Sequence, residues 1–104
     1  MIYHLALTKD WERALEKGWY QPAAEPAVRC FSDLQSLDLH TSQLPEAQQE
    51  AILLHIVEKR VKKQALITEG MPEGMVRFED KIGIESVDRT DMLFRKEDGT
   101  WVMA

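Results

Sequence analysis

The sequence predicts an α+β fold in which an N-terminal strand and helix pack on a curved, mostly antiparallel sheet. The first observation is that residues 2–7 read as a short apolar strand and that residues 8–17 follow with helical spacing. The second is that several short apolar runs, separated by turn residues, fill the second half of the chain. The third is Asp98-Gly99 between two of these runs, a strong signal for a β-hairpin. With 104 residues, the chain is expected to form a single domain, residues 1–104.

The opening strand is apolar or aromatic at nearly every position, as in a strand that is covered on both faces. Its alternation places Ile2, His4 and Ala6 on one face and Tyr3, Leu5 and Leu7 on the other. Thr8 is expected to cap the helix that follows, and Gly18 to end it. His4 is then a titratable group in an apolar strand, which needs a structural partner or faces a cleft.

The middle of the chain is less regular. Residues 19–31 contain two prolines and are expected to be extended or looped. Ser32-Asp33-Leu34-Gln35 matches a capping box with Ser32 as the N-cap, which predicts a short helix to about Leu39. Pro45 suits the first position of a further helical turn. Periodicity leaves residues 46–62 open between a helix and a central strand.

The C-terminal part is predicted to be mostly β-structure. Strands are expected at residues 65–68 and 75–78, and a segment with a tight bend or close packing at Gly83 is expected at residues 81–84. The hairpin joins residues 91–96 to residues 100–103.

Composition limits the class of function. The chain is 44% hydrophobic and 30% charged, which is an ordinary globular balance, and it has no apolar run long enough to span a membrane. The net charge of −5 argues against nucleic acid as a partner, because broad binding to phosphates needs an excess of Lys and Arg. The basic cluster of residues 59–63 is interpreted as a solvated edge. The single cysteine, Cys30, excludes an internal disulfide and fits a reducing compartment, so a cytoplasmic location is expected.

The order of these features resembles the family named domain of unknown function 952. The most specific likeness is in the N-terminal block, which consists of Met1-Ile2-Tyr3-His4, Asp10-Trp11 and Gly18-Trp19-Tyr20-Gln21-Pro22. It continues through Ile52-Leu53-Leu54-His55-Ile56, Ile67-Thr68-Glu69, Phe78 to Gly83, and Phe94 to Val102, and so covers nearly the whole chain. The resemblance favours a strand at residues 52–57.

This resemblance implies a small α+β domain with a cleft like that of ADP-ribosyltransferases and RNA 2′-phosphotransferases. His4 would then lie at the cleft floor, where related folds place a histidine that contacts ribose. The family's Gly-Phe-Ile-His-Cys-Ser block corresponds here to residues 27–32, and its Pro-His-hydrophobic-Tyr-Gly block to residues 79–83. Both blocks lack their histidine in this chain, so chemistry that depends on those imidazoles cannot operate unchanged. The positions that carry over are His4, Ser32, Glu69 and Gly83.

Four side chains are candidates for contact with an anionic or ribose-bearing ligand. A neutral imidazole at His4 could donate to a ribose hydroxyl or move a proton, and the alternative is a buried histidine bonded to backbone. Ser32 with Arg29 could hold a phosphate at a helix N-terminus, and the alternative is that Ser32 only caps the helix. Glu69 could orient a ribose hydroxyl or stabilise an oxocarbenium-like centre, and the alternative is an ordinary surface glutamate.

Two aromatic residues are candidates for the pocket wall. Trp19 and Tyr20 directly follow the first helix and could stack on a base or ring, and the more common explanation for such residues is packing alone. No metal site is predicted, because the three histidines and Cys30 lack the close spacing of zinc ligands. A small buried apolar role is expected for Cys30.

These observations lead to two hypotheses from different classes. The first is a small-ligand or nucleotide-binding domain with an ADP-ribosyltransferase-like cleft, no assigned catalytic residue, and a nicotinamide dinucleotide or an ADP-ribose-like compound as the ligand. The second is a non-enzymatic interaction or regulatory protein that keeps the fold and has lost the site. The first predicts that His4, Arg29 and Glu69 converge on one concave surface.

Overall fold

The computed structural model describes all 104 residues as nine strands, two α-helices and four short 3₁₀ turns. The strands are β1 (Ile2–Ala6), β2 (Trp19–Tyr20), β3 (Val28–Phe31), β4 (Glu50–Ile56), β5 (Leu66–Ile67), β6 (Met75–Phe78), β7 (Ile82–Gly83), β8 (Val87–Arg95) and β9 (Trp101–Met103). The helices are α1 (Thr8–Lys17) and α2 (Leu37–Thr41), and the 3₁₀ turns are η1 (Leu34–Ser36), η2 (Glu58–Arg60), η3 (Lys63–Ala65) and η4 (Ile84–Ser86). Neither α-helix has the length and apolar character needed to cross a membrane.

Seven strands form one sheet in the order β5-β6-β3-β1-β4-β8-β9, and β2 and β7 form a separate two-stranded ribbon. Every neighbouring pair is antiparallel, which confirms the predicted α+β class and the antiparallel sheet. One part of the prediction is wrong, because β1 does not pack on the sheet. It lies inside the sheet and pairs with β4 along all five residues.

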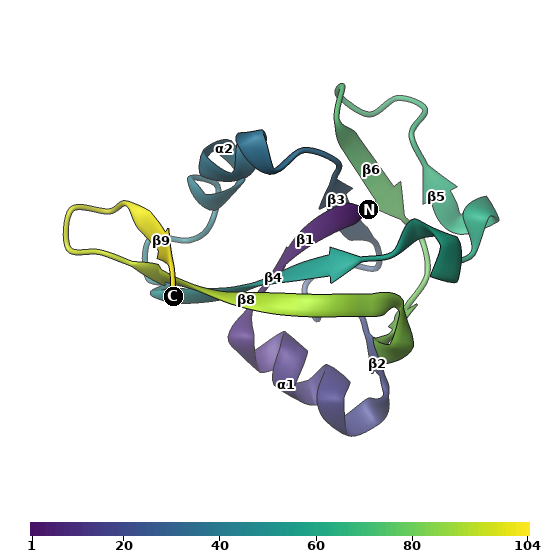
Figure 1. Cartoon of the computed structure of the whole chain (residues 1–104), viewed down its shortest axis with the longest axis horizontal. Helices are drawn as coiled ribbons and strands as arrows, with labels where there is room; N and C mark the ends of the chain where they lie inside the picture. Colours follow the sequence, from purple (N-terminus) through teal and green to yellow (C-terminus); the bar gives the residue numbers. More distant parts are fainter.

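The sheet separates two hydrophobic clusters, with α1 and α2 on opposite sides of it (Figure 1). Ile2 and Ala6 belong to the larger cluster together with Trp11 of α1, while Tyr3 and Leu5 pack against the smaller cluster. The predicted division of the opening strand into two faces is therefore confirmed. Strand β4 is buried at every position from residue 51 to 56, as expected for a strand covered on both sides. Residues 50–56 are thus a strand, which settles the choice that periodicity left open.

Helix α1 ends as predicted and begins one residue earlier than predicted. Gly18 adopts a left-handed φ of 87° and donates its N–H to the carbonyl of Ala14 at 2.8 Å. Thr8 is the first helical residue rather than the cap, and its hydroxyl has no hydrogen-bond partner. The extended conformation of the strand continues through Leu7, which occupies the N-cap position without a side-chain bond.

The capping box at residues 32–35 is also displaced by one residue. The carboxylate of Asp33 accepts the N–H of Gln35 at 2.7 Å, and the short turn η1 leads into α2. Ser32 instead donates its backbone N–H and its hydroxyl to the carbonyl of Gly74, at 2.9 and 3.3 Å. This pairing holds Ser32 in the extension of β3, so the capping role passes to Asp33. Pro45 begins a single turn closed by the N–H of Gln48 and no helix.

The predicted C-terminal strands are present as β5 to β9. The hairpin turn has Gly99 at a φ of 89°, and the carboxylate of Asp98 accepts the N–H of Thr100 at 2.9 Å. Strand β8 is longer than predicted, since it begins at Val87, and its pairing with β4 shifts register between His55 and Ile56. This irregularity has the form of a β-bulge.

Gly18→Ala is expected to lower the free energy of unfolding by about 1 kcal/mol, because an L-residue resists the left-handed conformation. A Cβ at this position meets no heavy atom within 4 Å, so the cost comes from the backbone alone. Urea unfolding monitored by circular dichroism measures it. Glu12→Ala, an exposed change within α1, is the matched control and should leave the midpoint nearly unchanged. Equal midpoints for Gly18→Ala and the wild type would contradict the prediction.

Candidate functional site

A cleft of about 320 Å³ lies where β1 and β3 separate. The two strands pair at a single register position, with Tyr3 opposite Phe31. Beyond that pair, side chains rather than a backbone ladder lie between the strands. Six of its lining side chains come from β1, β2, the β2–β3 loop, β3 and α2, and they are His4, Tyr20, Glu25, Arg29, Phe31 and His40.

His4 lies on the cleft wall, and both of its ring nitrogens are engaged within the protein. Nδ1 is 2.7 Å from the backbone carbonyl oxygen of Arg29, and Nε2 is 2.7 Å from the hydroxyl of Tyr20. Because a carbonyl oxygen only accepts, Nδ1 carries the proton and the Tyr20 hydroxyl donates to Nε2. Only 7% of His4 is exposed, and this burial lowers its pKa because desolvation disfavours the imidazolium. His4 is therefore a neutral imidazole at pH 7.

Tyr20 is among the residues that line the cleft. Its side chain is fully buried between the rings of His4 and Trp11, whose centroids lie 5.2 and 6.2 Å away. Burial raises the pKa of Tyr20, so the phenol remains protonated and can donate to His4. Trp19 does not line this cleft. The Nζ atoms of Lys17 and Lys81 lie 4.8 and 5.0 Å from its ring centroid, so it serves as a surface platform for two lysines.

Arg29 contributes to the cleft twice. Its backbone carbonyl accepts the hydrogen bond from His4, while its side chain is exposed and pairs with Glu25 through Nε at 3.0 Å. Both members of this pair line the cleft. An exposed pair of this kind stabilises the fold by no more than about 1 kcal/mol, so a ligand can displace Glu25 at little cost.

An aromatic pair completes the wall on the α2 side. The rings of Phe31 and His40 are stacked, with centroids 4.1 Å apart and planes inclined by 16°. Burial lowers the pKa of His40, so this ring is also neutral at pH 7. The sequence analysis did not place Glu25, Phe31 or His40 in a site. No local spacing in the sequence indicates them, because their proximity depends on the position of α2 over the sheet.

Ser32 and Glu69 do not line the cleft. The hydroxyl of Ser32 is used by the carbonyl of Gly74, and Glu69 is exposed in the loop that follows β5. The expected convergence of three side chains therefore holds for His4 and Arg29 but not for Glu69. The reason is the strand order, since β6 and β3 lie between β5 and β1. Cys30 is fully buried, as expected, and burial raises its pKa to about 12.

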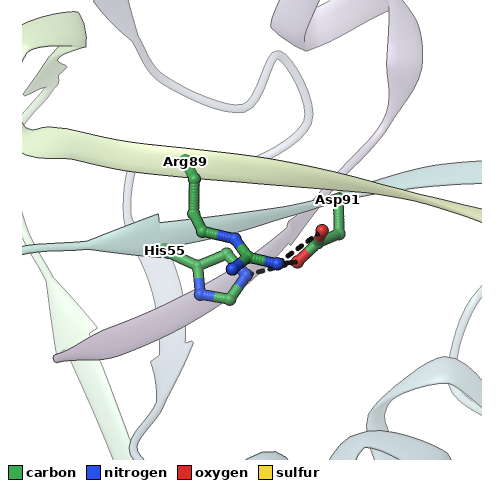
Figure 2. Close-up of polar contacts among 3 residues, drawn as sticks. All are labelled: His55, Arg89 and Asp91. Atoms are coloured by element: carbon green, nitrogen blue, oxygen red, sulfur yellow. Dashed lines mark hydrogen bonds and ion pairs between the residues drawn. The ribbon is translucent and has the colours of Figure 1, made fainter.

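A second polar cluster lies across β4 and β8, on the face of the sheet that also carries Tyr3. Figure 2 shows the imidazole of His55 and the guanidinium of Arg89 both directed at the carboxylate of Asp91. His55 Nε2 is 2.6 Å from Asp91 Oδ2, and Arg89 Nη2 donates to both carboxylate oxygens, at 2.9 and 3.1 Å. These bonds, chiefly the one from Arg89, lower the pKa of Asp91, which stays ionised at neutral pH. The sequence analysis named His55 in the segment that carries the family resemblance but assigned it no site, so it missed this cluster.

No protein-family model matches the chain, and no curated protein matches it. Among solved structures, it is similar to the X-ray crystal structure of protein CC0527 from Caulobacter crescentus, with a TM-score of 0.79. The match covers 97% of this chain and 92% of that one at 18% sequence identity. The structure of a double mutant of CC0527 gives a TM-score of 0.78 with the same coverage and identity. This likeness shows the fold.

The free energy of unfolding is expected to fall as the pH is lowered through about 6.5, the ordinary pKa of histidine. His4 and His40 both have lowered pKa values in the folded state. The unfolded chain therefore binds more protons than the folded one below this pH, and acid favours unfolding. Urea unfolding at about pH 7.5 and about pH 5.5 measures the difference.

His4→Gln removes the more deeply buried imidazole and should flatten this pH dependence, while His40→Gln serves as the matched control and should flatten it less. An unchanged slope in His4→Gln would contradict the interpretation of His4 as a neutral buried histidine.

Proposed function

We propose that this chain is a small-ligand-binding domain whose cleft between β1 and β3 takes a nucleotide-like compound of the nicotinamide dinucleotide or ADP-ribose class. The observation that carries the proposal is an exposed guanidinium, that of Arg29, beside a wall of aromatic and apolar side chains. The cleft volume of about 320 Å³ is at the small end of the range for ligand pockets. It suits one half of a dinucleotide, with the rest of the ligand outside.

Arg29 is suited to a phosphate because a guanidinium presents a planar fork of donors. Its ion pair with Glu25 uses Nε and leaves the two terminal nitrogens for a ligand. Arg77 lies opposite Arg29 in the β3–β6 register, so both start from the same face of the sheet, and Arg77 is held by Glu79 at 2.6 Å. Arg77 is paired with a glutamate and does not line the cleft, so the proposed phosphate contact rests on Arg29 alone.

The stacked rings of Phe31 and His40 offer apolar contact for a base or a nicotinamide ring. His4 supports the cleft from beneath, since its two nitrogens are already bonded to Arg29 and Tyr20. With Glu69 outside the cleft, the site holds no evident acid–base pair for group transfer. The proposal is therefore a binding function.

Two further parts of the proposal concern ancestry and location. A diverged relationship to domain of unknown function 952, with an ADP-ribosyltransferase-like cleft, is supported by the N-terminal block and by His4 on the cleft wall. A cytoplasmic location is supported by the single, buried and unpaired Cys30.

Adding nicotinamide dinucleotide, ADP-ribose or adenosine monophosphate should raise the melting temperature measured by differential scanning fluorimetry. A ligand at about 100 times its Kd adds about 2.7 kcal/mol to the stability of the folded state. Arg29→Gln should weaken binding by about tenfold, the effect of losing one charge-assisted hydrogen bond. Glu69→Gln is the matched control, because Glu69 is exposed and outside the cleft, and its binding should equal that of the wild type. No shift with any of the three compounds would reject the proposal.

The second candidate is the interaction or regulatory protein, and an apolar strip on β8 and β9 favours it. Met92, Phe94 and Val102 share one face of the sheet next to its edge strand and are 37–40% exposed. Exposed apolar side chains beside an open strand edge are a common feature of interaction surfaces. Self-association that disappears in Phe94→Lys, measured by sedimentation and combined with no ligand-induced shift, would favour this candidate.

A further inference from the structure

The two best-buried histidines of the chain differ in how their ring nitrogens are used. Both nitrogens of His4 are bonded within the protein, which is what a structural histidine requires. His55 bonds through Nε2 alone, and its Nδ1 has no partner in the protein. Four side chains have a solvent-inaccessible nitrogen or oxygen atom without a hydrogen bond, and they are Thr8, Arg77, Arg95 and Trp101. Nδ1 of His55 also lacks a hydrogen bond, but it is not solvent-inaccessible. Nδ1 therefore keeps a small solvent-exposed area, although His55 as a whole is only 8% exposed.

The carboxylate of Asp91 determines which form of the His55 ring is present. An ionised carboxylate only accepts, so in the neutral imidazole Nε2 carries the proton and Nδ1 carries the lone pair. Asp91 cannot rotate freely, because Arg89 binds both of its oxygens at 2.9 and 3.1 Å. The free lone pair is thus held in one orientation. Figure 2 shows Nδ1 on the side of the ring away from the carboxylate.

The backbone and a neighbouring ring reinforce this orientation. The register of β4 and β8 shifts between His55 and Ile56, and such bulges re-aim a side chain and are common beside functional sites. The ring of Tyr3 on β1 packs edge-on against His55, with centroids 5.2 Å apart and planes at 83°. A tenth of the His55 side chain and about two thirds of the Arg89 side chain are exposed, so the cluster meets solvent through the guanidinium.

We propose that His55, Asp91 and Arg89 form a second site, which activates water for the hydrolysis of small uncharged esters. In this site His55 Nδ1 is the general base, and Asp91 is a positioning residue. Arg89 is the group that stabilises negative charge on the ester, because its Nε and Nη1 make no hydrogen bond within the protein. The charges of Asp91 and Arg89 balance, so the site favours neither an anionic nor a cationic substrate. It shares no residue with the cleft, and the proposal does not depend on the ligand of that cleft.

Water lies against Nδ1 and attacks the ester carbonyl carbon while His55 accepts its proton, and the carbonyl oxygen becomes an oxyanion opposite Arg89. The carbon–oxygen bond to the alcohol then breaks, and the alkoxide recovers the proton from His55. One ester and one water give one acid and one alcohol, with His55 returned to its starting form.

The test uses p-nitrophenyl acetate as the probe and the full chain as the catalyst. His55→Gln should lower kcat/KM by about a hundredfold, at the lower end of what a general base contributes. Asp91→Asn should lower kcat with little change in KM, since the amide no longer imposes one ring form but leaves the surface shape intact. Glu12→Gln, at an exposed carboxylate of α1 outside both this cluster and the cleft, is the control and should retain wild-type activity.

A second measurement follows the ring nitrogens directly by ¹⁵N NMR. The wild type should show His55 with an unprotonated Nδ1 and a protonated Nε2, and Asp91→Asn should show a mixture of both forms. His55 should also react with diethyl pyrocarbonate while the protein is folded, whereas His4 should not. Ester hydrolysis that is equal in His55→Gln and the wild type would overturn the proposal. A His55 ring that is as unreactive as His4 would overturn it independently of any variant's stability.

Discussion

The pairing of β1 with β4 over residues 2–6 is the constraint on which the rest of the structure depends. Both strands are covered on both faces, and their side chains point alternately into the larger and the smaller hydrophobic cluster. A register shift of one residue would therefore move every side chain to the opposite cluster. This register sends His4 to the α1 side and Tyr3 to the α2 side. The cleft and the His55 cluster are therefore fixed relative to each other by a single strand pair.

The cleft exists because the other edge of β1 is nearly free of ladder bonds. Strand β3 pairs with β1 at one register position, and next to it Nδ1 of His4 donates a hydrogen bond to the backbone carbonyl of Arg29. Elsewhere in the sheet, such carbonyls accept hydrogen bonds from backbone N–H groups. The His4 side chain thus satisfies a partly buried carbonyl beside the cleft. Because both ring nitrogens of His4 are bonded within the protein, neither is left for a ligand or a proton transfer.

The sequence predicted correctly those features that depend on residues close together in the chain. The alternation in residues 2–7, the left-handed glycine after α1 and the Asp98-Gly99 hairpin depend on neighbours in the chain, and all three are present. It did not predict which distant residues lie together, because that depends on the order of strands in the sheet. Glu69 looked like a cleft residue, but two strands separate β5 from β1. The His55–Asp91 pair, 36 positions apart, comes from the β4–β8 register and its bulge, which no local pattern reveals. The placement of Ser32 depended likewise on its distant partner Gly74.

The small ribbon of β2 and β7 has a consequence for the order of folding. Tyr20, the hydroxyl partner of His4, is held in place by pairing with Ile82, and Trp19 by pairing with Gly83. The N-terminal strand, helix and cleft wall thus remain incomplete until a segment near the other end of the chain has arrived. Closing so long a loop is slow compared with forming helices and hairpins. During synthesis on the ribosome, Tyr20 can gain its strand partner only after residues 82–83 emerge, so this wall of the cleft becomes rigid late.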